Sequence, residues 1–544
     1  MRFIKILAFM FLYCRLVFSQ EITTTKINVK NDYIPSIIEA VRLNENAIYN
    51  DTSDIDKTQV YNFLDKTLKS NFKLKKISPA VIKNDKLKPL DKLTFSLLFG
   101  SAWTTQTDII YNSIRSKKTS YSLVLNHYSN RYDEYKNSRN LINLSFKNIT
   151  EQNIFRYNLN YDRRASVFLV SKLDDSDLFK NRFAYTELFF KLINNRKNNN
   201  LNYNTSLKLY DFNELSENFI GIKSELDFLV NDIPINVLFS SDIFFNYNNK
   251  NSIIGSQKSY SSSIFPSVQF SRYGYKFIGG LNINYIDNNS LSLFPEITFS
   301  KELVKDIILI KAGSNFNVYR NSLKALSDKN PYMHSFGTNQ LIFSENLFTQ
   351  ETLYTEEKNY FIYLKNVLDE YEFFETSLSY SSIQNFDHFI QLDTFNYTRF
   401  LVDYLSVKQV HLKIKYNKVI NDISSLNINL DYYNWNQQVY NHPNFIFYTS
   451  LPINFRNKLT LSPTFLFKSK MVAARYIDQI NLNNNVESIE LSSKMHLNLG
   501  LTYMYSDKLS AKLSLNNITN SKNEDWIGIS PLGFNVSFCI KSSF

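Results

Sequence analysis

Basic side chains recur inside segments in which apolar and polar residues strictly alternate. Arg156 lies between two aromatic residues, and Lys413 and Lys415 occupy every second position of an otherwise apolar run. Successive side chains of a β-strand point to opposite faces, so these cations would share a face opposite the apolar one. Rings of Lys and Arg inside a pore give selectivity for anions and phosphates. The candidates for lining such a lumen are Arg156, Lys311, Lys413, Lys415, Lys458 and Lys512.

Two interpretations of these cations stay open. They could form an anion-preferring interior, or carboxylates across the lumen or in the N-terminal segment could neutralise them. Lys311 differs from the others because the four residues before it are apolar on both faces. A charge facing lipid would cost about 2–4 kcal/mol near the membrane midplane, so both interpretations place the cations inside. The carboxylates that could pair with them are Glu225, Asp227, Glu296 and Asp431.

Histidine and cysteine residues give little support for catalysis or metal binding. The six histidines form no HExxH motif, and the two cysteines form no CxxC motif. His388 beside Asp387, together with His442 in a loop, is a weak acid–base candidate that chance explains better. Cys14 falls in the expected leader, so Cys539 would be the single thiol of the mature chain, and no intramolecular disulfide could form. We therefore expect no enzyme, no cofactor and no metal site.

The elements that carry the basic residues are predicted to be β-strands that follow one another from Lys92 to the C-terminus. The last 52 residues, 493–544, are typical of three strands in a row, each with one apolar face. The final strand ends on an aromatic residue in register with its apolar face. We interpret this face as the signal for barrel closure and assembly, formed by Phe534, Val536, Phe538, Ile540 and Phe544.

Composition favours a membrane protein that crosses with strands. Aromatic residues make up 15% of the chain, and many apolar rows end in Tyr, as the interfacial girdles of a barrel require. Beyond the N-terminus, no apolar run reaches the ~20 residues that a spanning helix needs. The net charge of +11 accompanies a composition rich in Asn, Lys and Ile and poor in Gly and Pro. Genomic drift explains such a composition, so the charge does not predict nucleic-acid binding.

The lengths of the connections predict the strand number. Counted back from the C-terminus, short and long connections tend to alternate along the chain. Bacterial barrels show the same pattern, because one rim has short turns and the other has long loops. Pairing the connections gives an all-β transmembrane antiparallel barrel of about 22 strands, with about 18–20 as alternatives because the count is uncertain around 335–398. Pro266, Pro295 and Pro463 fall inside strands and should disturb pairing there.

Residues 1–91 lack the alternating pattern of the rest of the chain and are not predicted to form barrel strands. Residues 1–20 have the positive start, apolar core and small-residue end of a secretory signal peptide. Residues 21–91 are polar and lack a clean period, and roughly 70 such residues rarely build their own core. We expect them to be mostly extended, in the periplasm or the lumen, and the barrel to occupy 92–544.

The C-terminal motifs resemble those of TonB-dependent-receptor-like outer-membrane barrels. The residues that carry the resemblance are Leu515–Asn520, Glu524–Gly528, Gly533–Val536 and the terminal Phe544. The chain departs from the family in having only an approximate Pro-x-x-Gly and no aromatic residue two places before the end. The segment before the barrel is also too short for the family's plug domain, and no glycine-rich plug motif is present. The resemblance thus implies a plugless relative and gives no reason to expect TonB as a partner.

These observations predict an outer-membrane protein of a Gram-negative bacterium, exported by its signal peptide. Its expected function is a passive or gated route for small solutes. The alternative is a non-transporting scaffold or accessory subunit of an outer-membrane complex, and a weaker one is adhesion through the long loops. Expected partners are outer-membrane lipid and lipopolysaccharide, the outer-membrane assembly machinery and periplasmic chaperones, and no nucleic acid.

Overall fold

The computed structural model describes residues 91–544 apart from 114–115, 117, 133–134, 168–179, 196–200, 214–215, 232, 247–256, 288–289, 334–351, 370, 395–396, 422 and 477–485. The expected signal peptide at 1–20 and all but the last residue of the expected segment at 21–91 lie outside the described residues.

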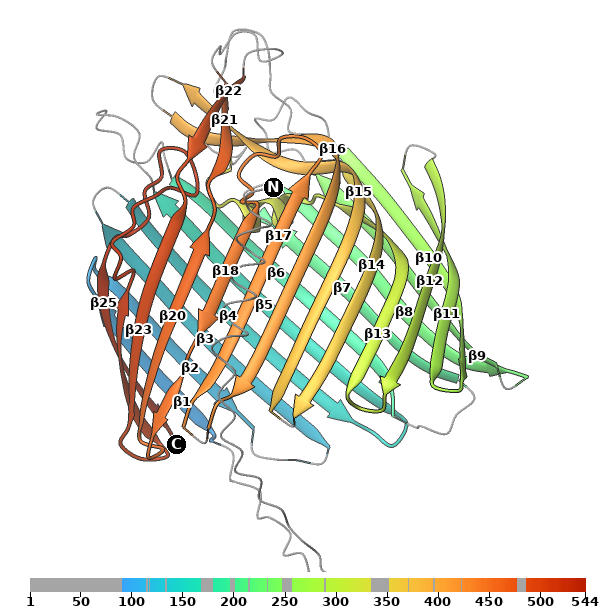
Figure 1. Ribbon diagram of the computed structural model, residues 1–544, viewed down its shortest axis with the longest axis horizontal. Coiled ribbons are helices and arrows are strands. Elements are labelled where there is room, and N and C mark those ends of the chain that lie inside the picture. The colour runs from blue at the N-terminus through green and yellow to red at the C-terminus, as the bar shows by residue number, and fades with distance from the viewer. Residues whose placement is uncertain are drawn as a thin grey trace, which may run out of the picture. The chain divides into compact units, whose positions relative to one another are not determined.

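The described residues form a closed antiparallel barrel (Figure 1). Its wall has 22 strands when β18 and β19, which both pair with β20, are taken as one interrupted strand, and the β21–β22 hairpin is left out. The prediction of about 22 strands is confirmed. The strands are β1 Leu93–Gly100, β2 Thr104–Asn112, β3 Thr119–Tyr132, β4 Tyr135–Ile149, β5 Asn153–Val167, β6 Lys180–Asn194, β7 Leu201–Phe212, β8 Glu217–Val230, β9 Ile233–Asn246, β10 Gln257–Arg272, β11 Tyr275–Ile286, β12 Ser290–Val304, β13 Ile308–Arg320, β14 Tyr354–Asp369, β15 Glu372–Thr394, β16 Tyr397–Val419, β17 Ser425–Trp435, β18 Phe445–Ser450, β19 Ile453–Phe455, β20 Leu459–Lys468, β21 Met471–Tyr476, β22 Val486–Leu491, β23 Lys494–Met504, β24 Leu509–Asn516 and β25 Asn535–Ser543.

The last strand closes the barrel against the first. The β1–β25 register runs from Thr94 opposite Ser543 to Gly100 opposite Ser537. Backbone hydrogen bonds of 2.7 Å tie Phe544 to Lys92 and Leu93. In β25, Phe538 and Ile540 are exposed on the outer face, as their alternation predicts.

The connections longer than six residues all lie on one rim of the barrel, where a few short turns such as 101–103 also occur. The rim that holds Leu93 and Phe544, here the terminal rim, carries short turns such as 273–274, 305–307, 456–458 and 505–508. The other rim, here the loop rim, carries the long connections 321–353, 436–444, 469–493 and 517–534. This is the arrangement that the sequence predicts.

Each of the three strand prolines coincides with an interruption of the hydrogen-bonded ladder. A proline has no N–H to donate, so it removes one bond from a neighbouring strand. At Pro266 the β10–β11 pairs skip from Ile264–Ile283 to Ser267–Gly280, and at Pro463 the pairs with β20 skip from Ser450–Thr464 to Ile453–Leu461. At Pro295 the β12–β13 ladder ends.

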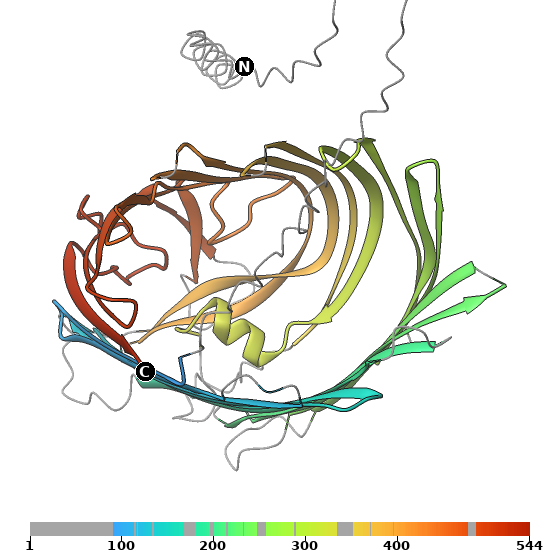
Figure 2. The same ribbon diagram turned by 90° about the horizontal axis from the view of Figure 1, so that it is seen from below.

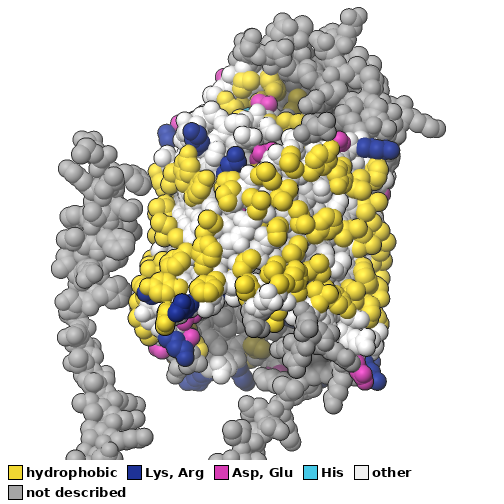
Figure 3. Space-filling model, turned by 90° about the vertical axis from the view of Figure 1, so that its right-hand side faces the viewer, with side chains coloured by type: hydrophobic (Ala, Val, Ile, Leu, Met, Phe, Trp, Pro, Cys, Tyr) yellow, Lys and Arg dark blue, Asp and Glu magenta, His cyan; other side chains and the backbone are white. Residues whose placement is uncertain are grey.

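The outer wall is apolar. Figure 3 shows a broad band of hydrophobic side chains on the wall, with charged side chains near its upper and lower ends. Exposed apolar side chains occur on strand after strand, for example Leu144, Leu188, Leu293, Ile362 and Phe538. Among the described residues, no helix has both the length and the apolar character to cross a membrane.

Several elements extend inward at the loop rim. β15 and β16 have 23 residues each, and their hairpin continues beyond the wall after an irregularity between Ile383 and Phe386. There Asn385 adopts a positive φ of 54°. The extended hairpin pairs in parallel with β21 (Figure 1). Helix α2, Leu323–Lys329, lies inside the ring of strands when the barrel is seen along its axis (Figure 2).

Candidate functional site

Five of the six predicted lumen cations lie on the inner face of wall strands. The register of neighbouring strands puts Arg156, Lys311, Lys413, Lys415 and Lys512 on the face opposite the exposed apolar rows. Lys458 differs, because it lies outside the strands in the exposed turn 456–458 at the terminal rim. A turn of three residues is too short to carry the alternation, so the strand pattern placed Lys458 in the lumen wrongly.

Arg156 belongs to a row of basic residues that sequence reasoning missed. Lys147 on β4 lies directly opposite Arg156 on β5, which lies opposite Lys191 on β6. The row continues through Ser206 on β7 to Lys223 on β8. Since directly opposed residues on adjacent strands are near neighbours on one face, these four strands concentrate positive charge on the lumen side. The same alternation that singled out Arg156 applies to Lys147, Lys191 and Lys223 and could have found them.

A second basic row crosses the opposite part of the wall. Lys276 on β11, Ser300 on β12 and Lys311 on β13 are successive neighbours. The row continues through Tyr363 and Ser377 to Lys413 on β16. The ammonium of Lys311 lies 5.7 Å from the centre of the Tyr363 ring. The lumen therefore has basic residues on two arcs of its wall.

The carboxylates considered as partners of these cations accept hydrogen bonds from Asn and His side chains, although Asp431 on β17 lies directly opposite Lys413 on β16. Glu225 accepts hydrogen bonds from Asn204 and Asn236, and Asp227 accepts one from Asn236. Glu296 accepts a hydrogen bond from the amide of Asn282, and Asp431 accepts one from the His411 ring. None of the four forms an ion pair with a lysine or arginine within the described part of the chain, and neither do Arg156, Lys413, Lys415 or Lys512.

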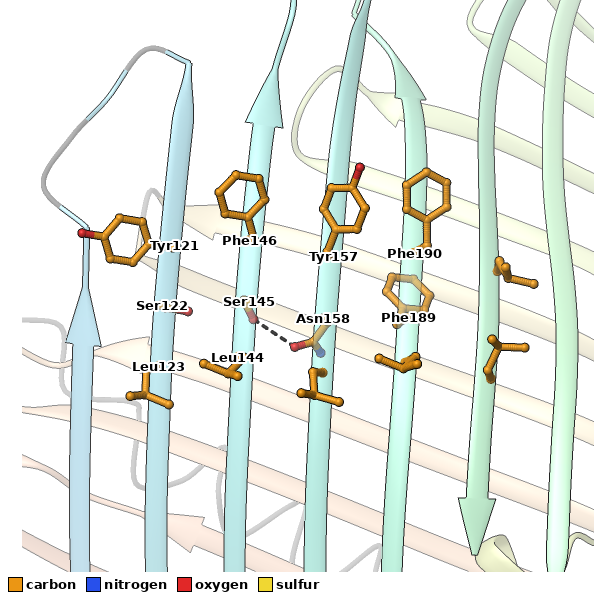
Figure 4. A pocket seen from close by; sticks show the side chains of 14 residues that line it. Tyr121, Ser122, Leu123, Leu144, Ser145, Phe146, Tyr157, Asn158, Phe189 and Phe190 are labelled. Atoms are coloured by element: carbon orange, nitrogen blue, oxygen red, sulfur yellow. Dashed lines mark hydrogen bonds between the residues drawn. The ribbon is translucent and has the colours of Figure 1, made fainter.

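The strands that carry the first basic row have a lipid-facing side that differs sharply from their lumen-facing side. Tyr121, Phe146, Tyr157 and Phe190 form an aromatic row across β3 to β6 (Figure 4). A row of leucines lies two residues further along each strand, and a shallow apolar groove of about 390 Å³ lies between the two rows. On the alternate positions, the Ser145 hydroxyl donates to the Asn158 side chain at 3.0 Å. Lipid-facing apolar rows and lumen-facing polar rows thus share the same strands.

The loop-rim end of the lumen is occupied by helix α2, which is fixed to the wall through Glu217. This carboxylate is fully buried on the first residue of β8. It accepts the backbone N–H of Leu323 at 2.9 Å and the Tyr210 hydroxyl at 2.8 Å. A carboxylate at the first turn of a helix satisfies backbone donors that have no partner within the helix. Ser322 caps the same turn by accepting the Ala325 N–H at 3.2 Å.

Ion pairs hold the rest of the helix. Asp328 of the helix pairs with Arg164 of the wall at 2.7 Å. Arg164 also pairs with Asp162 at 2.8 Å, and Asp162 pairs in turn with Arg139 at 2.9 Å. On the other side, Lys329 pairs at 2.6 Å with Asp387, a buried residue of the β15–β16 hairpin. The helix is therefore tied both to the wall and to the hairpin that bends across the mouth.

An apolar cluster joins these parts into one assembly, here the mouth cluster. It includes side chains from four wall strands, α2, both strands of the extended hairpin and the 517–534 connection. The Trp526 ring lies 5.4 Å from Phe389 and 5.2 Å from Phe400, edge-on to each. Members of the cluster are Phe183, Tyr185, Tyr210, Phe212, Phe219, Phe244, Leu323, Leu326, Met333, Phe389, Phe400 and Ile529.

The 517–534 connection is also held by charge. Asp525 pairs with Lys468 at 3.1 Å and with Lys494 at 2.5 Å. Burial acts to raise the pKa of Asp525, but the two lysines outweigh it, and the pKa lies below the usual aspartate range. The pair of ammonium groups thus fixes this loop beside the mouth.

The weak histidine candidates also lie at the mouth. His388 is buried, with its Nε2 3.4 Å from Asp403, and its neighbour Asp387 is engaged with Lys329. Burial lowers the pKa of His442, whose Nδ1 lies 2.8 Å from the carbonyl oxygen of Tyr440. No group of three or more potential metal ligands is found within the described ranges. Both histidines are thus held by contacts within the mouth.

Comparison with known proteins agrees with the architecture. No protein-family model matches the chain. No curated protein matches it. Solved structures do match: the pyoverdine receptor FpvA of Pseudomonas aeruginosa bound to pyoverdine is 13% identical, with 84% of this chain and 79% of that chain covered and a TM-score of 0.59. A mutant ferric enterobactin receptor, PfeA, of the same organism is 12% identical, with 83% and 80% covered and a TM-score of 0.60. The copper transporter OprC is 8% identical, with 84% and 80% covered and a TM-score of 0.61.

These matches show the fold of this chain. It is a 22-strand β-barrel that matches the TonB-dependent outer-membrane receptors in structure at low sequence identity. The resemblance carried by the C-terminal motifs is confirmed at the level of the fold.

Proposed function

We propose that this chain is an outer-membrane protein that conducts small anionic solutes, with passage controlled by the mouth cluster and helix α2. The observation that carries the proposal is the basic row Lys147, Arg156, Lys191 and Lys223 on the lumen face of a closed barrel. Positive rings in a lumen favour anions because they lower the electrostatic cost of entry for negative charge.

The orientation of the barrel follows from its rims. The terminal rim, with its short turns, would face the periplasm, and the loop rim would face outward. Solutes would then meet α2 and the extended β15–β16 hairpin before they reach the basic rows. Similar solved structures are named as a ferric enterobactin receptor, a pyoverdine receptor and a copper transporter, which supports transport as the class of function. Insertion would use outer-membrane lipid and the assembly machinery, with the β25 face Phe534–Phe544 as the signal.

Reversal potentials in planar bilayers under a KCl gradient test the proposal. We expect the mature chain to prefer chloride, and the variant Lys147→Gln/Arg156→Gln/Lys191→Gln to lose most of that preference. The matched control is Lys305→Gln/Lys458→Gln/Lys508→Gln, which removes the same charge from exposed turns at the terminal rim. The control should keep the preference for anions.

Two results would count against the proposal. A cation preference in the unmodified chain would refute the anion path. If neither the unmodified chain nor a variant in which α2 is detached conducted ions, the alternative would be favoured, a non-transporting scaffold within an outer-membrane complex.

A further inference from the structure

The backbone ladder between β12 and β13 covers only part of the length of the two strands. Their ladder runs from Val304–Ile308 to Ile297–Ser314 and then stops. Their other edges are fully paired, since β11 pairs with β12 along all of β11, and β14 pairs with β13 along all of β13. Residues 290–296 of β12 and 315–320 of β13 therefore have no ladder between them. These two segments are here the β12–β13 seam.

Pro295 explains why the ladder stops at this point. Its carbonyl oxygen accepts the Ser314 hydroxyl at 3.3 Å, so this edge of Pro295 faces β13. In an antiparallel pair, the N–H and the C=O of a residue point to the same neighbour. The N–H that Pro295 lacks is thus one that β13 would have used.

Side chains replace the missing ladder. The backbone N–H of Phe316 donates to the Glu296 carboxylate at 3.1 Å, and its carbonyl oxygen accepts the Asn282 amide at 2.9 Å. The rings of Phe294 and Phe316 lie 5.3 Å apart, and Tyr360 is 6.2 Å from Phe294. Aromatic contacts and side-chain hydrogen bonds can part without unzipping a backbone ladder, so this seal is easier to open than a paired wall.

The seam has an apolar outer side and ends at a polar cavity. On the outer side, Leu291 and Leu293 of β12 are 62% and 58% exposed. At the loop rim, a cavity of about 450 Å³ is lined from both sides of the seam, by Ser259, Asp287 and Ser290 and by Arg320, Tyr354 and Glu356 among others. Each end of the unpaired segments, Ser290 and Arg320, contributes to it.

Arg320 is the buried cation of this cavity, whose lining also carries Lys258, Asp287 and Glu356. The guanidinium belongs to a residue that is only 8% exposed. Its hydrogen bonds go to the hydroxyls of Ser259 and Thr352, and it lies over the Phe244 ring at 4.6 Å. Within the described residues it forms no ion pair, although Glu217 acts on it at longer range. A buried guanidinium bonded to hydroxyls alone is suited to an anionic group.

We propose that the β12–β13 seam is a lateral portal for the alkyl chain of an anionic single-chain amphiphile, with its head group bound at Arg320. The chain would pass between Phe294 and Phe316 as these rings separate, and the head would remain in the cavity. This portal does not depend on ion conduction through the lumen, because its path leaves the barrel through the wall.

Fluorescence quenching by 12-bromododecanoate tests the portal in proteoliposomes. Phe316→Trp places an indole in the seam, and Phe189→Trp places a matched indole on the lumen face of the fully paired wall. The quenching of each variant is compared with that of the unmodified chain, which has three tryptophans of its own. We expect saturable quenching at position 316 and weak, linear quenching at position 189. Arg320→Gln should raise the half-saturating concentration several-fold, in protein whose heat-modifiable gel migration shows an intact barrel.

The outcomes separate the sources of the alkyl chain. In vesicles of phosphatidylcholine with brominated acyl chains, quenching at position 316 that unbrominated dodecanoate relieves would show that membrane lipid occupies the same portal. Equal and linear quenching at both positions would overturn the proposal. So would saturable quenching that Arg320→Gln leaves unchanged, because the head group would then bind elsewhere.

Discussion

The membrane wall and the mouth of this barrel are built by different means. In the wall, residues that contact each other lie on adjacent strands. Whether a side chain faces lipid or lumen follows from its position in an alternating apolar and polar run. In the mouth, partners are far apart in the chain: 106 residues separate Glu217 from Leu323, 164 separate Arg164 from Asp328, and 136 separate Gln391 from Ile527. Within the described residues, the wall cations Arg156 and Lys512 form no ion pair, whereas the mouth engages Asp328, Asp387 and Asp525 in ion pairs. The mouth is therefore the part of the path that single substitutions can release.

Glu217→Ala should have the largest effect. It leaves two backbone N–H groups and the Tyr210 hydroxyl without their acceptor, and each buried donor left unsatisfied costs roughly 1–3 kcal/mol. We expect α2 to detach and the single-channel conductance to rise several-fold. Glu225→Ala is the control, since Glu225 lies on the same strand and face and its partners among the described residues are the side chains of Asn204 and Asn236. If both variants conducted alike, Glu217 would not hold the mouth shut.

Lys329→Met should have an intermediate effect. It leaves Asp387, which is 2% exposed, without its cation. The cost should be roughly 1–3 kcal/mol, below the usual range for a broken buried pair, because the Lys329 side chain is half-exposed. Urea unfolding of refolded protein measures the loss. Adding Asp387→Asn should restore part of the stability, and a double variant weaker than the single one would contradict the pairing.

Acidification should give the smallest effect, confined to the 517–534 connection. The pKa of Asp525 is lowered by Lys468 and Lys494, so its stabilising contribution is present above the unfolded aspartate value of about 3.9 and is lost as pH falls through the lowered folded value. Trp526 fluorescence should therefore change on titration below about pH 4. In Asp525→Asn this change should be absent, and a change that persists would assign it to another group.

The same contrast explains how much the sequence could predict. Strand number, rim assignment, the closing face of β25 and the inward direction of Arg156, Lys413 and Lys512 all follow from a period of two and from turn lengths. Lys458 was misplaced because the pattern does not show where a strand ends and a turn begins.

The mouth was beyond sequence reasoning for a physical reason. Glu217 lies at the start of a strand, and nothing near it in the chain indicates that its partners are backbone groups of a distant helix. The position of Pro295 did predict disturbed pairing, but not that the pairing would be lost along about half of the length of β12 and β13.

Modification of Cys539 tests the central claim most directly. This residue faces the lumen on β25, opposite Lys512 on β24 and Leu98 on β1. The measurement compares its rates with anionic sulfonatoethyl and cationic trimethylammonioethyl methanethiosulfonate. The reference is Trp103→Cys in a Cys539→Ser background, at a turn position that is 83% exposed. The account predicts a higher anion-to-cation rate ratio at Cys539 than at the reference. A ratio equal to or below the reference would contradict it.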